Sequence, residues 1–299
     1  MRYAKYLFVF VAMFVLMACD KEDEAKSTNW DINWYEIQDK PGELNHLIYE
    51  VYRDYGVPIF INDTIGSQIV DYDYDGNPIV YYEELRPGYT IQEYNTAIHY
   101  ALSHDSVSLI AAVEAFRDYV MPKLPETVFT RSYLFVDSLV TTGYYGLDVS
   151  WPINKAAERY MTTTIVGRIA EMKTLTGEER KVWAGNLLGD LLVNHVRNIY
   201  EKQLEDFYLL SYTTAGKTKY RTPLVGFGNS KVAQNWGFID FAYSNVTPSE
   251  TEDVAMFLAL FYNGSSEEIF KEEFAKWPKV LKKYDIMKEI VADIQANSK

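Results

Sequence analysis

The chain contains little of the two residue types that most often bind metal ions or form cross-links, with one cysteine and four histidines in 299 residues. The single cysteine, Cys19, excludes an internal disulfide. No two histidines are four residues apart, which excludes an HExxH motif, in which imidazoles one helical turn apart bind zinc. The histidines lie at His46, His99, His104 and His195.

Basic side chains are also scarce, with 29 Lys and Arg against 42 Asp and Glu. The first nineteen residues hold two of the positive charges and none of the negative ones, so the remainder has 27 against 42, a net charge of −15. Because this charge repels a phosphate backbone, we expect no nucleic-acid partner.

Long apolar runs are absent after the N-terminus, so no later segment offers the roughly eighteen apolar residues of a membrane span. The exception is "YLFVFVAMFVLM", which follows Arg2 and Lys5 and has the pattern of a secretory signal over residues 1–19. Its end, Leu16-Met17-Ala18-Cys19, resembles a bacterial lipobox. The resemblance implies that Cys19 carries a lipid that attaches the mature chain to a membrane.

Residues 20–33 are polar and acidic, and we expect a flexible tether. The segment resembles the acidic signal that sends lipoproteins of some Gram-negative anaerobes to the outer face of the outer membrane. The predicted location is therefore the cell surface, on an outer-membrane lipid anchor.

The remaining residues, 34–299, are predicted to form one domain in which strands come first and helices later, an α+β fold. Apolar periodicity predicts helices near 40–56, 90–103, 108–124, 178–210, 250–262, 265–276 and 283–296, and strands near 57–62, 128–142 and 159–172. Residues 68–85 read as a hairpin that turns at Asp75–Pro78. A calcium loop starting at Asp71 is the alternative, although its twelfth position is Tyr82 instead of the glutamate that calcium requires.

The longest predicted helix carries Asn194, His195 and Asn198 at its centre. Asn194 and Asn198 project from one face because they are four residues apart. A zinc-binding helix has histidines at such positions, with a glutamate beside the first, but asparagine is a poor zinc ligand. We interpret His195 as a histidine beside the core, with a ligand or base role as the alternative. The predicted apolar stripe is Val182, Leu188, Leu191, Leu192, Val196, Ile199 and Leu204.

Segments around this helix resemble a known family, the lipoprotein zinc metallohydrolases associated with substrate import, which are zincin-like, zinc-binding metallopeptidases. In that family an HExxH helix is followed by a Gly-Phe-Val-Ser-x-Tyr-Ala-like segment and a Glu-Asp-Phe-Ala-Glu-like helix. The resemblance covers residues 40–296 and is best over 185–262. It rests on "ELNHLIYEVYRDYGVPIFIND" (43–63), "QNWGFIDFAYS" (234–244), "ETEDVAM" (250–256) and "WPKVLKKYDIMKEIVADI" (277–294).

The resemblance implies a zincin-like fold, with a small N-terminal sheet and a mainly helical C-terminal half. It puts Asn194 and Asn198 at the two histidine-ligand positions and His195 at the glutamate position. Glu252 stands at the third ligand, and Met256 replaces a carboxylate that would orient a ligand histidine. Only Glu252 keeps the chemistry of the family, so we predict a vestigial site without zinc.

Three functions follow as hypotheses. The first is a pseudoenzyme that binds a peptide or glycan, or assists a TonB-dependent nutrient receptor, since the genes of this family lie near such receptors. The second is an active hydrolase with displaced ligands, drawn from His195, Glu252 and one of His46, His99 or His104. The third is an interaction protein that uses some of its 25 tyrosines as a partner surface.

Overall fold

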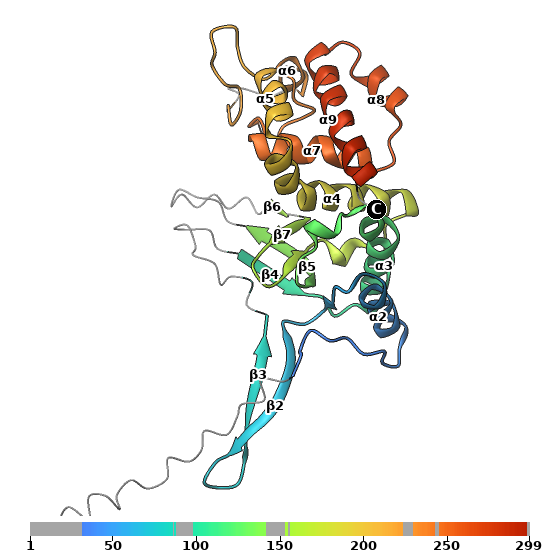
Figure 1. The fold of residues 1–299 in the computed structure, drawn as a ribbon, viewed down its shortest axis with the longest axis vertical. Helices are drawn as coiled ribbons and strands as arrows, with labels where there is room; N and C mark the ends of the chain where they lie inside the picture. The colour runs from blue at the N-terminus through green and yellow to red at the C-terminus, as the bar shows by residue number, and fades with distance from the viewer. Residues whose placement is uncertain are drawn as a thin grey trace, which may run out of the picture. The chain divides into compact units, whose positions relative to one another are not determined.

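The computed structural model describes residues 32–85, 87, 98–141, 153–154, 156–223, 230–242 and 245–297 (Figure 1). Cys19, the signal at 1–19 and the tether up to residue 31 lie outside the described residues, as does the start of the helix predicted at 90–103. The described residues belong to two compact units. The smaller comprises Gly66–Glu83 with the N-terminal segment through Trp34, and the larger comprises Tyr35–Ile65 with the chain from Glu84 onward. The single domain over 34–299 stays a prediction.

The smaller unit is built on the predicted hairpin, whose strands are β2 (Thr64–Tyr72) and β3 (Pro78–Glu84) (Figure 1). Asp73 holds the turn, because its carboxylate accepts hydrogen bonds from the backbone N–H groups of Asp75 at 3.0 Å and Asn77 at 2.7 Å. Gly76 takes a positive φ of 81°, which glycine tolerates without a steric penalty. The hairpin interpretation is therefore confirmed, and the Asp73 side chain serves the turn.

The larger unit contains a six-stranded sheet around β5 (Tyr133–Thr141). The first half of β5 pairs in parallel with β1 and β8, and its second half pairs antiparallel with β4 and β6. Strand β7 pairs antiparallel with β8. The other strands are β1 (Ile59–Phe60), β4 (Ile98–Leu102), β6 (Ile153–Asn154), β7 (Ala157–Arg159) and β8 (Thr164–Val166).

The helix predicted over 90–103 is wrong where the chain is described, because Ile98–Leu102 forms strand β4. Its residues pair with β5 from Ile98 opposite Thr141 to Leu102 opposite Val136. His99 and Ala101 are exposed, whereas Tyr100 and Leu102 are half-buried. This alternation has the period of a strand, and pairing with a buried neighbour outweighs the helical pattern of the longer window.

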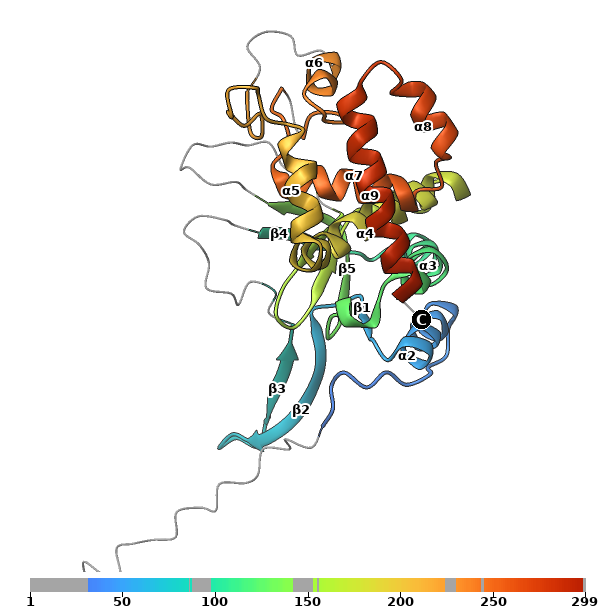
Figure 2. The same ribbon diagram turned by 45° about the horizontal axis from the view of Figure 1, so that its top comes forward.

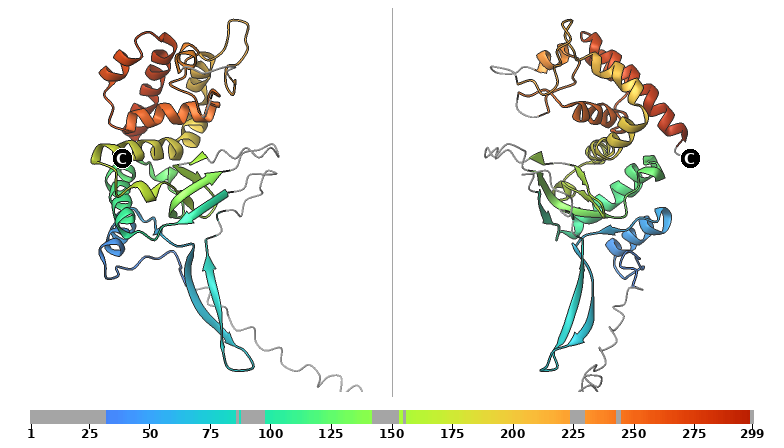
Figure 3. Two further views of the ribbon diagram at one scale, coloured as in Figure 1. Left: turned by 180° about the vertical axis from the view of Figure 1, so that it is seen from behind. Right: turned by 60° about the vertical axis from the view of Figure 1, so that its left-hand side comes forward.

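Helices α2 (Glu43–Tyr55) and α3 (Ser106–Ala115) pack against each other beside this sheet, as Figure 3 shows. Both confirm predicted helices, and α2 ends at Gly56 in the left-handed conformation. The chain continues from α3 through a π-helical turn, η1 (Phe116–Val120), and a 3-10 turn, η2 (Met121–Lys123). Phe116 packs edge-on against Tyr133 and Phe135 of β5, so this segment anchors the helices to the sheet.

The C-terminal half is helical, as predicted, and consists of six helices in the described chain. Helix α4 lies between the sheet and the helices α5 and α7 (Figures 1 and 3), and α9 lies beside α5 and α7 (Figure 2). Two short 3-10 turns, η3 (Glu126–Val128) and η4 (Ile169–Glu171), precede α4. The helices are α4 (Gly177–Ile199), α5 (Glu201–Leu209), α6 (Ser230–Asn235), α7 (Glu250–Tyr262), α8 (Glu267–Glu273) and α9 (Pro278–Asn297).

The predicted 178–210 helix is interrupted at Tyr200, whose φ of −108° and ψ of 28° separate α4 from α5. The Tyr200 hydroxyl donates a 2.6 Å hydrogen bond to Asp293 of α9, so the break lies where the chain is tied to the last helix. Most of the predicted stripe is buried, but Val182 and Ile199 are 45% and 59% exposed. The architecture is α+β, and none of the described helices is long and apolar enough to cross a membrane.

Candidate functional site

The two helices that the resemblance brings together, α4 and α7, are in direct contact through glycines. A Cβ atom added to Gly189 would lie 2.5 Å from the carbonyl oxygen of Ala255, and one added to Gly185 would lie 2.8 Å from that of Ala259. The two backbones can approach so closely only because each glycine has a hydrogen atom in place of a side chain. Successive turns of the two helices are therefore packed together, which is the pairing that a site shared between them requires.

Asn194, His195 and Asn198, the residues that the resemblance puts at a metal site, lie near the end of α4. Asn194 and Asn198 are exposed, and His195 between them is half-buried. Burial lowers the pKa of His195, which favours the neutral imidazole. This environment agrees with the interpretation of His195 as a histidine beside the core.

Glu252 occupies the first turn of α7, where its carboxylate caps the helix. Its Oε2 atom accepts hydrogen bonds from the backbone N–H of Ser249 at 2.7 Å and from the Ser249 hydroxyl at 2.8 Å. The Ser249 hydroxyl in turn accepts from the N–H of Glu252, which completes a capping box. Arg221 adds an ion pair to the same Oε2 atom at 3.3 Å. Glu252, which the resemblance puts at the third ligand position, thus stabilises a helix terminus.

No hydrogen bond in the described chain joins Glu252 to Asn194 or Asn198. The close approach of these three side chains stays a prediction, and so does the vestigial role assigned to them. Met256, which the resemblance puts at the place of an orienting carboxylate, is half-buried on α7. Two neutral amides and a carboxylate engaged in capping do not fit zinc, which prefers imidazole or thiolate ligands.

The residue after Glu252 belongs to a buried charged cluster that the sequence analysis did not identify. Lys283 of α9 and Asp253 of α7 form an ion pair between Nζ and Oδ2, with side chains 0% and 1% exposed. The Lys283 ammonium also donates to the Ser211 hydroxyl at 2.7 Å and to the Tyr220 hydroxyl at 3.1 Å. Tyr220 donates its own proton to Asp253 Oδ2 at 2.8 Å. All three ammonium protons therefore have acceptors.

Aromatic rings surround this ammonium group. Its nitrogen lies 4.5 Å from the ring centroid of Phe207, 4.7 Å from that of Phe238 and 5.2 Å from that of Tyr220. The negative faces of aromatic rings attract a cation, most strongly where water is excluded. Phe207 lies on α5, Tyr220 lies in the segment before α6, and Phe238 follows α6. One lysine thus joins elements that are distant in sequence.

Burial dominates the electrostatics of the pair. It lowers the pKa of Lys283 and raises the pKa of Asp253, and the attraction between the two charges opposes both shifts. Burial also raises the pKa of Tyr220, which keeps its hydroxyl protonated. The other carboxylate oxygen, Asp253 Oδ1, is buried and has no hydrogen-bond partner among the described residues. The ion pair thus offsets a desolvation cost that either charge alone would leave uncompensated.

The serine and lysine of this cluster have the separation of a nucleophile and its base, yet their arrangement favours a structural role. In its ammonium form, paired with Asp253, Lys283 donates to Ser211 and has no free electron pair with which to accept the serine proton. Ser211 and Lys283 are both 0% exposed, which excludes a substrate from them in this conformation. A lysine at a core-facing position of the last helix, between buried Val280 and Met287, is the signal in the sequence that could have revealed the cluster.

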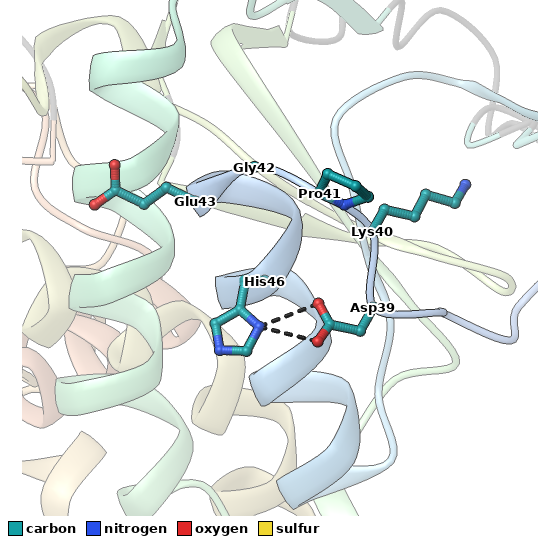
Figure 4. A pocket seen from close by; sticks show the side chains of 6 residues that line it. All are labelled: Asp39, Lys40, Pro41, Gly42, Glu43 and His46. Atoms are coloured by element: carbon teal, nitrogen blue, oxygen red, sulfur yellow. Dashed lines mark hydrogen bonds and ion pairs between the residues drawn. The ribbon is translucent and has the colours of Figure 1, made fainter.

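A shallow depression of about 420 Å³ lies where the chain enters α2, lined by residues 39–43 and His46 (Figure 4). The Nδ1 atom of His46 lies 3.1 Å from the Asp39 carboxylate, whereas the Lys40 side chain points away. His46 Nε2 also lies 3.8 Å from Glu50, which pairs with Arg117 at 2.7 Å. These contacts tie the segment before α2 to α2 and η1, and they place no nucleophile beside the imidazole.

The displaced-ligand hypothesis requires the histidines to gather near Glu252. His46 is on α2, His99 on β4 and His104 between β4 and α3. Within the part of the chain that the structure describes, no three His, Cys, Asp or Glu side chains lie close enough to hold a metal ion. The proposed set of His195, Glu252 and a further histidine is therefore not assembled in this structure.

Comparison with known proteins adds no relative: no family model, no curated protein and no solved structure matches this chain.

Proposed function

We propose that this protein is a lipid-anchored lipoprotein of the outer membrane, exposed at the cell surface, whose zincin-like frame binds a ligand and does not hydrolyse it. The lipobox ending at Cys19 and the acidic segment at 20–33 support the anchor and the location. The resemblance around α4 and α7, with the glycine-mediated contact between these helices, supports the frame.

The observation that carries the proposal is the chemistry at the former ligand positions. Asn194 and Asn198 offer neutral amide oxygens, and the carboxylate of Glu252 is held by Ser249 and Arg221. An Asn pair with an engaged carboxylate cannot replace two imidazoles and a free carboxylate around zinc. The helical frame is kept while the catalytic chemistry is absent, which is the pattern of a pseudoenzyme.

The ligand class follows from the resemblance. The family that the chain resembles consists of metallopeptidases associated with nutrient import, so we propose a peptide or glycan ligand and an accessory role beside a TonB-dependent receptor. The alternative, an active hydrolase with displaced ligands, has less support, because the described histidines lie on separate elements.

Restoring the ligands tests the frame directly. The triple variant Asn194→His, His195→Glu, Asn198→His would rebuild an HExxH helix facing Glu252, and we expect it to bind zinc. Because zinc binds only the folded state, the melting temperature of the triple variant should rise with zinc concentration, whereas the melting temperature of the parent should not. The matched control adds Glu252→Gln, which keeps a capping side chain but removes the carboxylate ligand.

Two results would contradict the proposal. Stoichiometric zinc in the purified parent would show that the native site binds metal. Equal zinc affinity of the triple variant and its Glu252→Gln control would show that the α4 positions do not face Glu252. The anchor is tested separately by Cys19→Ser, which should release the protein from the membrane fraction into the soluble fraction.

A further inference from the structure

The hairpin of β2 and β3 exposes apolar side chains on both of its faces. Successive residues of a strand point to opposite faces, so Ile69 and Val70 of β2, and Tyr81 and Tyr82 of β3, cannot share one face. All four are exposed, by 55%, 38%, 45% and 55% respectively. Tyr72, Tyr74 and Ile79 add exposed fractions of 60%, 105% and 47%. The surface of this one hairpin is thus unusually rich in solvent-exposed aliphatic and aromatic groups.

A two-stranded sheet with this composition is incomplete by physical criteria. Isolated hairpins are only marginally stable in water, and additional strands or a packed apolar face normally stabilise them. Among the described residues β2 and β3 pair only with each other, so the described part of the chain adds no third strand at either edge. Exposed edges and clustered apolar side chains together are the features to which an additional strand binds.

The negative charge of the hairpin favours a partner with basic side chains. Between Asp54 and Leu85 the sequence contains no lysine or arginine. Residues 66–83 of the hairpin carry Asp71, Asp73, Asp75 and Glu83, and the three aspartates are exposed. Such a surface repels a second copy of itself and repels anionic phospholipid, whereas it attracts lysine and arginine side chains.

We propose that this hairpin binds an extended, lysine- or arginine-rich segment of a partner protein, which adds to it as a third strand. Backbone hydrogen bonds along the open edge would supply affinity. Apolar side chains of the segment would pack on the tyrosines and isoleucines, and its basic side chains would pair with the aspartates. This inference stands on the hairpin alone and is independent of the proposed zincin-like frame.

Synthetic peptides test it without altering the protein. The probe is an alternating lysine–valine peptide of about nine residues, long enough to pair with the seven residues of β3. A second peptide has the same side chains but N-methyl groups on alternate amides, which remove the donors of one edge. A third replaces lysine by glutamate. We expect the first to bind, and each of the other two to bind at least about tenfold more weakly by fluorescence anisotropy.

Protein variants locate the binding surface. Asp71→Lys with Asp75→Lys should weaken binding of the first peptide by about tenfold or more. The control, Glu268→Lys with Glu272→Lys on α8, makes the same change in net charge at exposed positions and should bind like the parent. Equal binding of the N-methylated peptide would overturn strand addition. If the α8 control weakens peptide binding equally, or if the parent does not bind the first peptide, the hairpin is not the site. The proposal also fails if the protein binds phosphatidylglycerol vesicles in preference to the peptide.

Discussion

Glu252 and Asp253 are adjacent carboxylates on α7, and the fold uses them in opposite ways. Glu252 is 34% exposed at the side chain and bonds to backbone and hydroxyl groups three residues earlier. Asp253 is 1% exposed and pairs with Lys283, thirty residues later in the chain. Adjacent residues on a helix point about 100° apart, so one faces the rim of the helical half and the other faces its interior.

The difference shows how environment sets the importance of a charge. Water solvates part of Glu252, so its loss removes a cap but leaves no group unpaired in the core. Asp253 and Lys283 are buried, so water cannot replace a missing partner. Each charge therefore offsets the desolvation cost of the other. We therefore expect Glu252, the candidate ligand in the sequence, to contribute less to stability than Asp253 does.

The largest effect is expected from breaking the buried pair. Lys283→Met removes the ammonium while keeping much of the apolar stem, and leaves Asp253 buried without a counter-charge. We expect a loss of about 3–5 kcal/mol in the free energy of unfolding, measured by urea denaturation. The double variant Lys283→Met, Asp253→Leu removes both charges and should recover most of that loss. A double variant as unstable as the single one would show that packing, and not charge, makes Lys283 important.

A smaller effect is expected where α7 meets α4. Gly189→Ala places a methyl group 2.5 Å from the Ala255 carbonyl oxygen, so the helix that carries both carboxylates must shift. We expect a net destabilisation of about 1–3 kcal/mol, despite the better helix propensity of alanine. Gly177→Ala is the matched control, because a Cβ atom there meets nothing within 4 Å. Thermal unfolding should shift downward for the first variant only, and a neutral Gly189→Ala would contradict the tight contact.

The smallest effect is expected at Glu252. Glu252→Ala removes the capping box and the Arg221 ion pair, and we expect a loss of about 1 kcal/mol, typical of a helix cap. Glu252→Gln should lose less, since glutamine also accepts the N–H of Ser249. Denaturation of both variants in parallel measures the difference. A loss as large as that of Lys283→Met would mean that Glu252 has a buried partner, and the contrast between the two carboxylates would fail.

Local patterns predicted those elements whose signals lie within one segment. Gly56 ends α2, and the Ser249–Glu252 spacing lies at the start of α7, in the region where a helix was predicted. The turn from Asp73 to Asn77 likewise follows from aspartate, glycine and asparagine at the positions that need them. Helix α6 was not predicted, because six residues carry too little periodicity to distinguish a helix from a loop.

Predictions that depended on distant partners were less successful. Residues 98–102 were assigned to a helix, although pairing with β5 makes them a strand. The continuous helix over 178–210 ends at Tyr200, where a hydrogen bond to Asp293 holds the break. At the candidate site, the residue types at Asn194, His195, Asn198 and Glu252 could be read directly, but the engagement of Glu252 with Arg221 could not.

The sequence by itself determined the α+β order of elements, the acidic charge, the hairpin and the presence of Asn194 and Asn198 on α4, because each depends on residue identity or short-range periodicity. Only the tertiary structure decided that Lys283 and Asp253 share a desolvated, aromatic-lined site and that Arg221 pairs with Glu252. Tyr220, Ser211 and Lys283 are separated by many residues, and the chain must fold before burial can make their charges and hydroxyls depend on one another.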